Sequence, residues 1–466
     1  MRVLRSFSND KTMRMLACLL LSFGLALNAQ ADLAERRLGN GLKVIVKTDH
    51  RAPVVVSQVW YRAGSMDESY GTTGVAHVLE HMMFKGTQAV PAGEFSKQIA
   101  AAGGRENAFT SRDHTAYFQT LQKDRLALAF KLEADRMVNL NLAPAEFAKE
   151  IQVVMEERRM RTEDEPHALL YENFMATAFE AHPYRHPVIG WMGDLKNMTV
   201  ADAQAWYRHW YAPNNATLVV AGDVEPEQVF TLAEQYFGPI PARALPERKP
   251  LVEPVQSGMK RVVTRAPAKL PYLLMAWPAP KLSDPAKDWE PYALEVLAGV
   301  LDGNASARLS QRLVKERKIA TEVSAGYDDA ARGPVQFMLD ATPAEGHSVD
   351  EVQAALTHEI VRIQRDGISD KELQRVKAQV LAGQVFQRDS LFYQAMQIGE
   401  WVTAGLDYRL LNQRFERIRA VTAEQVREVA KRYLVDDKLT VATLDPLPLP
   451  EGKAEAAAMM GDGHVR

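Results

Sequence analysis

“MTVADAQAWYRHWYAPNNATLVVAGDV” (residues 198–224) is the stretch that shows how this chain of 466 residues is organised. Thr199 is typical of a helix N-cap, and Asp202 at the third helical position completes a capping box. The stretch then ends in the apolar run “ATLVVAG”, which is typical of a buried strand. It therefore predicts a capped helix that leads into a strand.

The same pattern returns near the other end of the chain. “VTAEQVREVAKRYLVDDKLTVATLD” (residues 421–445) has Thr422 and Gln425 in the two capping positions and closes on the strand-like “KLTVATL”. Both units are preceded, in the same order, by two strand-like segments, an apolar helical segment, a third strand-like segment and a long helical region. A tandem duplication explains this order better than chance.

The duplication predicts two homologous domains, residues 32–240 and 259–448. Residues 241–258 between them are rich in proline and charge, which suits an extended linker. Residues 449–466 are expected to form a disordered tail. Strands and helices mix without strict alternation, so the predicted class is α+β, with a mixed or antiparallel sheet and helices layered on one face in each domain.

The N-terminus has the composition of an export signal. A basic start is followed by the apolar run “LACLLLSFGLAL” and then by Ala29 and Ala31 in a small-x-small pattern. This order predicts a signal peptide over residues 1–31, cleaved after Ala31, and hence a periplasmic or secreted protein. The uncharged apolar block argues against the alternative, a mitochondrial transit peptide. No segment of the remaining sequence is long and apolar enough to span a bilayer stably.

Composition limits the available chemistry. The net charge of -3 does not indicate nucleic acid or an anionic membrane as a partner. The only cysteine, Cys18, lies in the predicted signal peptide. The mature chain would have no disulfide and no thiolate ligand, so any metal must be held by histidines and carboxylates.

Such residues crowd one apolar helical segment, “TTGVAHVLEHMMFKGT” (residues 72–87). His77 and His81 are four apart and share a helix face, with Glu80 beside them. Burying three such groups without partners would cost several kcal/mol, so a metal explains them better than a packed core does. Two imidazoles and a carboxylate suit Zn²⁺, and the order H-x-x-E-H inverts the usual zinc-protease motif.

A third ligand is expected from “AEFAKEIQVVMEERRMRTEDE” (residues 145–165), an amphipathic helix. Its carboxylates include those of Glu146, Glu150, Glu156 and Glu157. Spacing alone does not choose among them, because acidic helix faces are usually just solvated.

Three segments together carry a family resemblance: “HVLEHMMFKGT”, “GGRENAFTSRDHTAYF” and “EIQVVMEER”. The chain resembles the pitrilysin/insulinase (inverzincin) zinc metallopeptidases, and most of all their short two-domain members, the mitochondrial processing peptidase subunits and bacterial two-subunit relatives. The resemblance implies half of a clamshell and one Zn²⁺ per chain. It assigns Glu157 as the third ligand, Glu150 as the acid that orients a ligating imidazole, and Glu80 as the general base.

The resemblance also implies a substrate-docking edge strand within residues 106–118, where a peptide adds as a further strand. Asn107 and Ala108 match family positions that contact substrate near the scissile bond. His182 and His186, in “HPYRHPVIG”, are expected to be structural rather than a second metal site.

The second half departs from the metal pattern. Alignment of the two apolar helices places Leu294, Leu297 and Ala298 opposite His77, Glu80 and His81, and the later helix places Gly383 opposite Glu157. One site per chain is therefore expected.

Active members of the family also use an arginine and a tyrosine from a C-terminal half to bind the substrate carbonyl. Gln336 stands where the arginine is expected, no tyrosine follows downstream, and Tyr327 and Arg332 are out of register. In the two-subunit relatives a homologous zinc-less chain supplies this pair. The resemblance thus implies a heterodimer, with a homodimer as the other arrangement.

The expected function is an exported zinc endopeptidase that cleaves peptides or unfolded polypeptides bound in extended form. Glu80 would act as general base on a water activated by Zn²⁺. The alternative is a non-catalytic structural or assembly subunit, which the missing arginine and tyrosine favour and the intact zinc motif opposes. Peptide binding and delivery without cleavage is a third interpretation.

Overall fold

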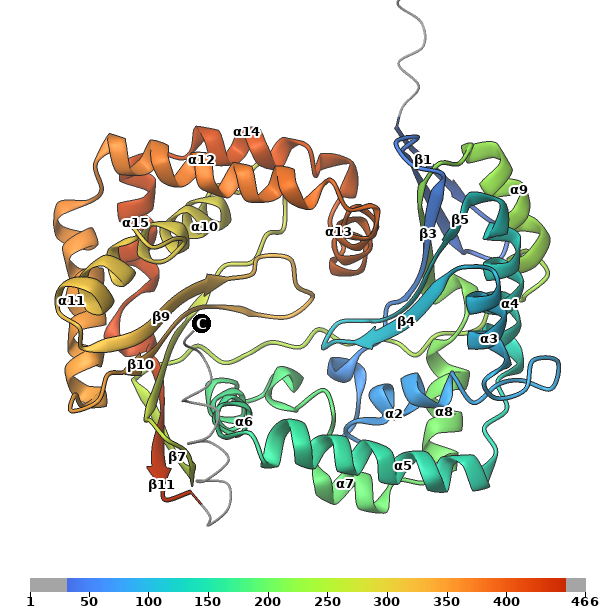
Figure 1. The fold of residues 1–466 in the computed structure, drawn as a ribbon, viewed down its shortest axis with the longest axis horizontal. Coiled ribbons are helices and arrows are strands. Elements are labelled where there is room, and N and C mark those ends of the chain that lie inside the picture. The colour runs from blue at the N-terminus through green and yellow to red at the C-terminus, as the bar shows by residue number, and fades with distance from the viewer. Residues whose placement is uncertain (1–31, 450–466) are drawn as a thin grey trace, which may run out of the picture.

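The computed structural model describes residues 32–449 and shows two lobes side by side, the N-terminal half in blue to green and the C-terminal half in yellow to red (Figure 1). Each lobe is built on one β-sheet that carries helices. The predicted α+β class with two similar halves is thereby confirmed. The predicted signal peptide, and the predicted tail from residue 450 on, lie outside the described residues.

The sheet of the first half has the strand order β1-β2-β6-β3-β5-β4. Strands β2 and β6 pair in parallel and the other neighbours are antiparallel, so the sheet is mixed. β4 lies at one edge. The strands are β1 (Leu33–Arg37), β2 (Lys43–Thr48), β3 (Val54–Tyr61), β4 (Arg105–Thr110), β5 (Thr115–Gln122) and β6 (Ala216–Gly222).

The sheet of the second half has the order β7-β11-β8-β10-β9, with β7 and β11 parallel and the other pairs antiparallel. Its order repeats the first sheet from β2 to β4, as a duplication predicts. The strands are β7 (Lys260–Pro267), β8 (Tyr272–Ala279), β9 (Ala320–Tyr327), β10 (Val335–Pro343) and β11 (Thr440–Leu447).

The two sequence units that begin at Thr199 and Thr422 fold as predicted. Each threonine is the N-cap of a helix and forms a capping box, with Asp202 and Gln425 as the respective partners. Capping satisfies backbone N–H groups that the first helical turn leaves free. The helices they begin are α8 (Val200–Trp210) and α15 (Ala423–Tyr433).

The remaining helices fall into the same two halves. In the first half they are α2 (Val75–Met82), α3 (Glu94–Ala101), α4 (Leu126–Asn139), α5 (Pro144–Arg158), α6 (Pro166–Ala178), α7 (Met192–Asn197) and α9 (Pro226–Phe237). In the second half they are α10 (Glu290–Leu301), α11 (Val349–Asp366), α12 (Asp370–Gln387), α13 (Leu391–Ala404) and α14 (Gln413–Ala420).

Alternation along β3 explains how the first sheet is covered. Val55 and Val59 pack into the core of their own half, whereas Val56 and Trp60 belong to a core that continues into the second half. Successive residues of a strand point to opposite faces, so β3 is buried on both sides. The helices of the first half cover one face, and the other face needs a cover from elsewhere.

That cover is α13, from the second half, which packs on β3 and β6. The contact is close, because a Cβ added at Gly399 of α13 would lie 2.0 Å from the Trp60 ring. The exchange is reciprocal: α6 of the first half packs on β7 and β11 of the second sheet, where Leu170 and Phe174 join its outer core. Figure 1 shows α13 between the two lobes and α6 beside β7 of the second sheet.

Residues 241–259 connect the halves and form neither helix nor strand. Arg248 in this segment contacts Asp67 at 3.0 Å. Arg332, from the loop between β9 and β10, also binds Asp67 through both terminal nitrogens, at 2.7 and 2.9 Å. The halves are therefore joined by the buried Arg332–Asp67 ion pair as well as by the exchanged helices.

Candidate metal centre

Helix α2 presents its polar residues to one side and its apolar residues to the core. Val75, Val78 and Leu79 are buried, while His77 and His81 keep 13% and 21% of their side chains exposed. This division follows from the 3.6-residue period of the helix. The sequence pattern thus places both imidazoles on one open face.

The N-terminus of α2 is fixed by Gly74 and Glu68. Gly74 has φ 90°, and a Cβ there would lie 2.5 Å from the carbonyl oxygen of Ile189, so only glycine fits. The Glu68 carboxylate accepts hydrogen bonds from the N–H groups of Gly74 (2.8 Å) and Ala76 (2.9 Å). Burial raises the pKa of Glu68 to about 8.

His77, His81 and Glu157 form a group whose ligand atoms all lie within 4.8 Å of one another. Glu157 Oε2 is 3.3 Å from His81 Nε2 and 3.9 Å from His77 Nε2. In a tetrahedral site with bonds of about 2.1 Å, ligand atoms lie about 3.4 Å apart. The three side chains therefore fit one Zn²⁺ ion.

The protonation of the imidazoles also suits a metal. Burial, followed by the charge of His81, lowers the pKa of His77 to about 3, so its ring is neutral. His81 Nδ1 lies 2.9 Å from Glu150 Oε1, an arrangement that directs Nε2 toward Glu157. A carboxylate behind a ligating imidazole fixes the ring and raises its basicity. Lys85 in turn pairs with the other oxygen of Glu150.

Glu157 comes from the C-terminal end of α5, which is held in place by ion pairs. Its Oε1 binds Arg161 at 2.7 Å, which leaves Oε2 directed at the histidines. The next residue, Arg158, is buried and binds both oxygens of Glu172 on α6. A π-helical turn, Arg159–Glu163, follows directly, and such turns are frequent at functional sites.

Glu80 lies beside the three ligand candidates but outside their group. Its carboxylate accepts a hydrogen bond from the Thr110 hydroxyl at the end of β4. Burial raises the pKa of Glu80 above its usual value. A carboxyl group with a raised pKa is a better proton acceptor, which suits general-base chemistry.

A cavity of about 980 Å³ is lined by His77, Glu80, His81 and Glu157. Asn107 and Ala108 of β4 line the same cavity. The resemblance implied an edge strand in residues 106–118, and the structure divides this stretch between β4, which lies at the edge, and β5, which pairs with it. An edge strand offers unpaired backbone groups to an extended chain. The structure thus brings all of the sequence-predicted site residues except Glu150 to one cavity, and Glu150 lies directly behind His81.

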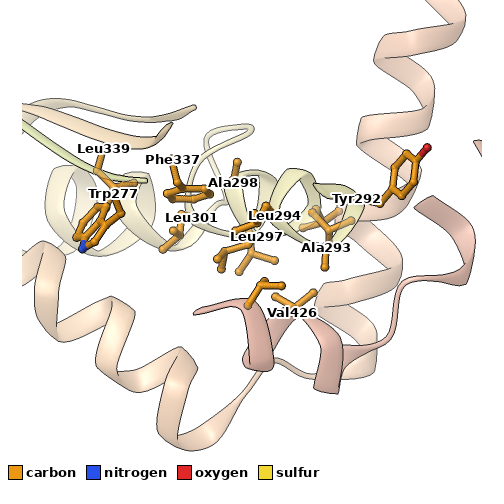
Figure 2. Packing of buried hydrophobic residues seen from close by; sticks show 14 of the residues in the cluster. Trp277, Tyr292, Ala293, Leu294, Leu297, Ala298, Leu301, Phe337, Leu339 and Val426 are labelled. Carbon is orange, nitrogen blue, oxygen red and sulfur yellow. The ribbon is translucent and has the colours of Figure 1, made fainter. Parts of the chain in front are cut away.

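The equivalent helix of the second half, α10, is apolar. Leu294 and Leu297 are fully buried and Ala298 is 9% exposed, and Figure 2 shows them packed among other core side chains. Gly383 lies on α12, the counterpart of α5. In the part of the chain that the structure describes, the group on α2 and α5 is the one found.

The residues considered for carbonyl binding are engaged elsewhere. Tyr327 donates to the carbonyl oxygen of Pro280, and Arg332 is buried against Asp67. Gln336 lines a neighbouring cavity rather than the metal cavity.

His182 and His186 do not form a metal group. Tyr184 N donates to His182 Nδ1, and Trp191 Nε1 donates to His186 Nδ1, each at 3.2 Å. Burial lowers the pKa of both, that of His182 to about 4. Gly333 of the second half packs against the His182 ring, so this histidine contributes to the contact between the halves.

Sequence reasoning missed the residues that support the site. Thr110, Lys85 and Arg161 contact Glu80, Glu150 and Glu157, and Glu68 caps α2. No pattern in the sequence marks a hydroxyl or a lysine as a partner of a distant glutamate. Glu68 lies six residues before the N-cap Gly74, too far for a standard cap, so it was not found either.

Comparison with known proteins gives two family matches. The profile described as “Insulinase (Peptidase family M16)” matches residues 43–190, and the profile described as “Peptidase M16 inactive domain” matches residues 197–380. A zinc protease, PqqE of Helicobacter pylori, is 29% identical over 95% of this chain and 100% of its own length. An uncharacterized zinc protease of Mycobacterium leprae is 30% identical over 89% of this chain and 92% of its own.

A more distant relative and two solved structures are also similar to this chain. The probable mitochondrial-processing peptidase subunit beta of Arabidopsis thaliana is 25% identical over 88% of this chain and 78% of its own. A protease from Helicobacter pylori has the same fold with a TM-score of 0.84, at 29% identity over 89% of this chain and 99% of that chain. The first half of the periplasmic protease PqqL from Escherichia coli has a TM-score of 0.76 at 19% identity, over 94% of this chain and 98% of that one.

Proposed function

The chain belongs to the insulinase family, peptidase family M16, and from this premise we propose that it is a zinc-dependent endopeptidase acting on peptides bound in extended form. One observation carries the proposal. The ligand atoms of His77, His81 and Glu157 lie within 4.8 Å of one another, in a cavity that also holds Glu80 and is bordered by a free edge strand.

The proposed roles follow from the donor set. His77, His81 and Glu157 would hold Zn²⁺, which in such a site supplies the Lewis acidity that activates a water and polarises a carbonyl. Glu80, kept in place by Thr110, takes the proton of the attacking water and returns it to the leaving amine. Glu150 keeps the His81 ring oriented through the whole cycle.

The proposed substrate is a peptide or an unfolded polypeptide that pairs with β4. Backbone pairing supplies affinity for any extended chain and leaves side chains to set the preference. Asn107 and Ala108 lie on the cavity side of that strand and would contact the substrate near the scissile bond.

We further propose that the chain works as an exported heterodimer with a homologous zinc-less subunit. Gln336 stands where the family's carbonyl-binding arginine is expected, and Tyr327 and Arg332 are engaged elsewhere. The Arabidopsis relative is named as a subunit, which supports this arrangement, and a homodimer is the alternative. One similar structure is named a periplasmic protease, which supports export. None of the described helices has the length and apolarity of a bilayer-spanning segment.

The test is peptide cleavage by the chain from residue 32 onward, alone and with its co-purified partner. An unstructured peptide should be cut in the presence of zinc, cleavage should stop with a chelator, and re-addition of zinc should restore it. Cleavage that ignores the chelator would contradict the zinc site.

A non-catalytic assembly subunit is the second candidate, and the missing arginine and tyrosine favour it. It predicts no chelator-sensitive cleavage by the chain in either state. The same two assays, on the chain alone and on the complex, therefore separate the two functions.

A further inference from the structure

Arg112 is the cation of the metal cavity that has no carboxylate partner. It lies two residues beyond Thr110, where β4 ends, and lines both the metal cavity and an adjoining cavity of about 600 Å³. Its Nη2 donates to the Tyr171 hydroxyl at 3.1 Å, and its Nε has no hydrogen-bond partner. None of the ion pairs within residues 32–449 involves Arg112, whose side chain contacts the Tyr171 hydroxyl and the rings of Tyr171 and Tyr184.

The other charges on this wall are already paired. Three glutamates of the cavity each bind a different arginine, and the fourth, Glu80, binds Thr110. The three ion pairs are Glu156 with Arg159, Glu157 with Arg161, and Glu172 with Arg158. The guanidinium of Arg112 is thus left available for a group that is not part of this chain.

The surroundings of Arg112 suit a carboxylate. Its guanidinium carbon lies 5.8 Å from the ring centroid of Tyr171 and 5.5 Å from that of Tyr184, contacts that hold the group in place. Because the Tyr171 oxygen accepts from Arg112, its own O–H remains free to donate. A fixed guanidinium beside a free hydroxyl forms a donor set that matches the oxygens of a carboxylate.

The position of Arg112 relates it to the substrate. A peptide that pairs with β4 passes Asn107 and Ala108 and then reaches the end of the strand, where Arg112 follows. Resting on the proposed function, we propose that Arg112 and Tyr171 form a subsite for a carboxylate of the bound peptide, either an acidic side chain or the free C-terminus. The substrate class is thereby narrowed to peptides with a negative charge on one side of the scissile bond.

The acids nearest to this subsite do not occupy it. Three acids line the adjoining cavity but not the metal cavity, and none forms an ion pair with Arg112: Asp328, Glu400 and Asp113, whose carboxylate accepts from the Tyr184 hydroxyl and the Arg332 N–H. Burial, followed by the charge of Asp328, raises the pKa of Glu400 to about 7, which weakens its repulsion of an anion.

The test uses matched fluorogenic peptides that carry Glu or Gln at each position around the cleaved bond, each with a free or an amidated C-terminus. Hydrogen bonds to a charged group contribute about 1.5–3 kcal/mol, so one Glu peptide should have a kcat/KM roughly tenfold above its Gln partner. If the terminal carboxylate is the ligand, kcat/KM should fall when the C-terminus is amidated and not when Glu is replaced by Gln.

Ratios within each variant separate the subsite from general damage. The Glu-to-Gln ratio should fall to about one in Arg112→Met, stay partly raised in Arg112→Lys, and fall below one in Arg112→Glu. Arg105→Met is the matched control, because Arg105 is exposed at the start of β4 and lines neither cavity, so it should keep the wild-type ratio.

The same ratio is measured as binding to zinc-loaded Glu80→Gln by fluorescence anisotropy, which does not depend on turnover. Equal affinity for charged and neutral peptides, in cleavage and in binding, would overturn the subsite while chelator-sensitive cleavage leaves the zinc peptidase standing. If Glu80→Gln prefers charged peptides in binding but the wild-type protein cleaves none of them, the subsite is supported and the peptidase is rejected.

Discussion

Helices α2 and α10 occupy the same place in the two halves and serve opposite purposes. α2 carries His77, Glu80 and His81 toward a cavity, whereas the matching residues of α10 are buried apolar side chains. The sheets beneath them have the same order. The topology therefore does not require a polar site, and the same place in the fold holds a polar helix in one half and a core helix in the other.

The polar helix needs support that the apolar one does not. Glu150, Thr110 and Glu68 reach α2 from three other segments and bond to His81, Glu80 and the Ala76 N–H, whereas the buried Nδ1 of His77 has no partner. In the second half the nearby charges neutralise one another, since Arg414 is held between Glu295 (2.6 Å) and Asp329 (2.8 Å). The first half therefore uses buried charges to support the residues of α2, whereas the second half uses them in ion pairs with one another.

The largest expected effect comes from placing glutamine at the matching positions of α2 and α10, which should reduce activity in α2 and stability in α10. Glu80→Gln removes the proton acceptor and should lower kcat by about 10²–10⁴-fold with zinc content and unfolding free energy unchanged. Steady-state kinetics and metal analysis of the purified, zinc-loaded protein measure this. Turnover at the wild-type rate would show that Glu80 is not the base.

Leu297→Gln, at the matching position of α10, should do the reverse. It buries an amide without partners at a fully buried site, at a cost of about 2–4 kcal/mol in unfolding free energy. Urea unfolding followed by circular dichroism measures it, with the zinc content of the folded fraction as control. A fully stable Leu297→Gln protein would mean that α10 is not a core helix.

Gly399→Ala tests the helix that the second half lends to the first. A Cβ at this position meets the Trp60 ring at 2.0 Å, so α13 must shift, at about 1–3 kcal/mol. Gly383→Ala is the matched control, because nothing lies within 4 Å of its added Cβ, and it should stabilise by about 0.5–1 kcal/mol. Both are measured by urea unfolding, and equal effects would reject the close contact.

Thr110→Val tests how the base of the polar helix is positioned. Loss of one hydrogen bond to Glu80 should lower kcat about tenfold, with KM and zinc content little changed. Thr110→Ser keeps the hydroxyl and should restore most of the rate. A rise in KM alone would instead place Thr110 in substrate binding.

The smallest effect concerns His114, at the contact between β5 and α13. Its ring meets Trp60 at 4.7 Å, Thr403 lies 3.4 Å from Nδ1, and burial lowers its pKa to about 3. The folded state keeps this ring neutral while the unfolded chain binds a proton below about pH 6.5, so stability is lost as the pH falls from 6.5 toward 3.

The expected loss through His114 is about 1 kcal/mol between pH 7 and pH 5.5. His114→Gln should therefore show a shallower decline of unfolding free energy over that range, whatever its stability at pH 7. An unchanged slope would show that His114 is protonated in the folded protein.

The sequence was sufficient where the information is local. The capping residues Thr199 and Thr422 and the spacing of His77 and His81 are short-range patterns, and the structure has the expected helices around them. Glu157 was different, because four glutamates on one helix satisfy the spacing equally and only the family resemblance chose among them.

Long-range pairing was not predictable from one chain. The outer faces of α6 and α13 have no pattern that distinguishes packing on a neighbouring sheet from packing on their own, so the exchange was missed. The same holds for Arg112, whose lack of an acidic partner becomes visible only when the distances to all carboxylates are known.

The exchange of α6 and α13 bears on how the chain arose. Two copies of a single half, each inserting one helix over the exposed sheet of the other, would form a closed twofold dimer of the domain-swapped kind. Joining such a pair head to tail through residues 241–259 would give the present molecule. Each half then needs a helix of the other to cover its sheet. The half without the metal residues is therefore retained because it covers the sheet of the other half.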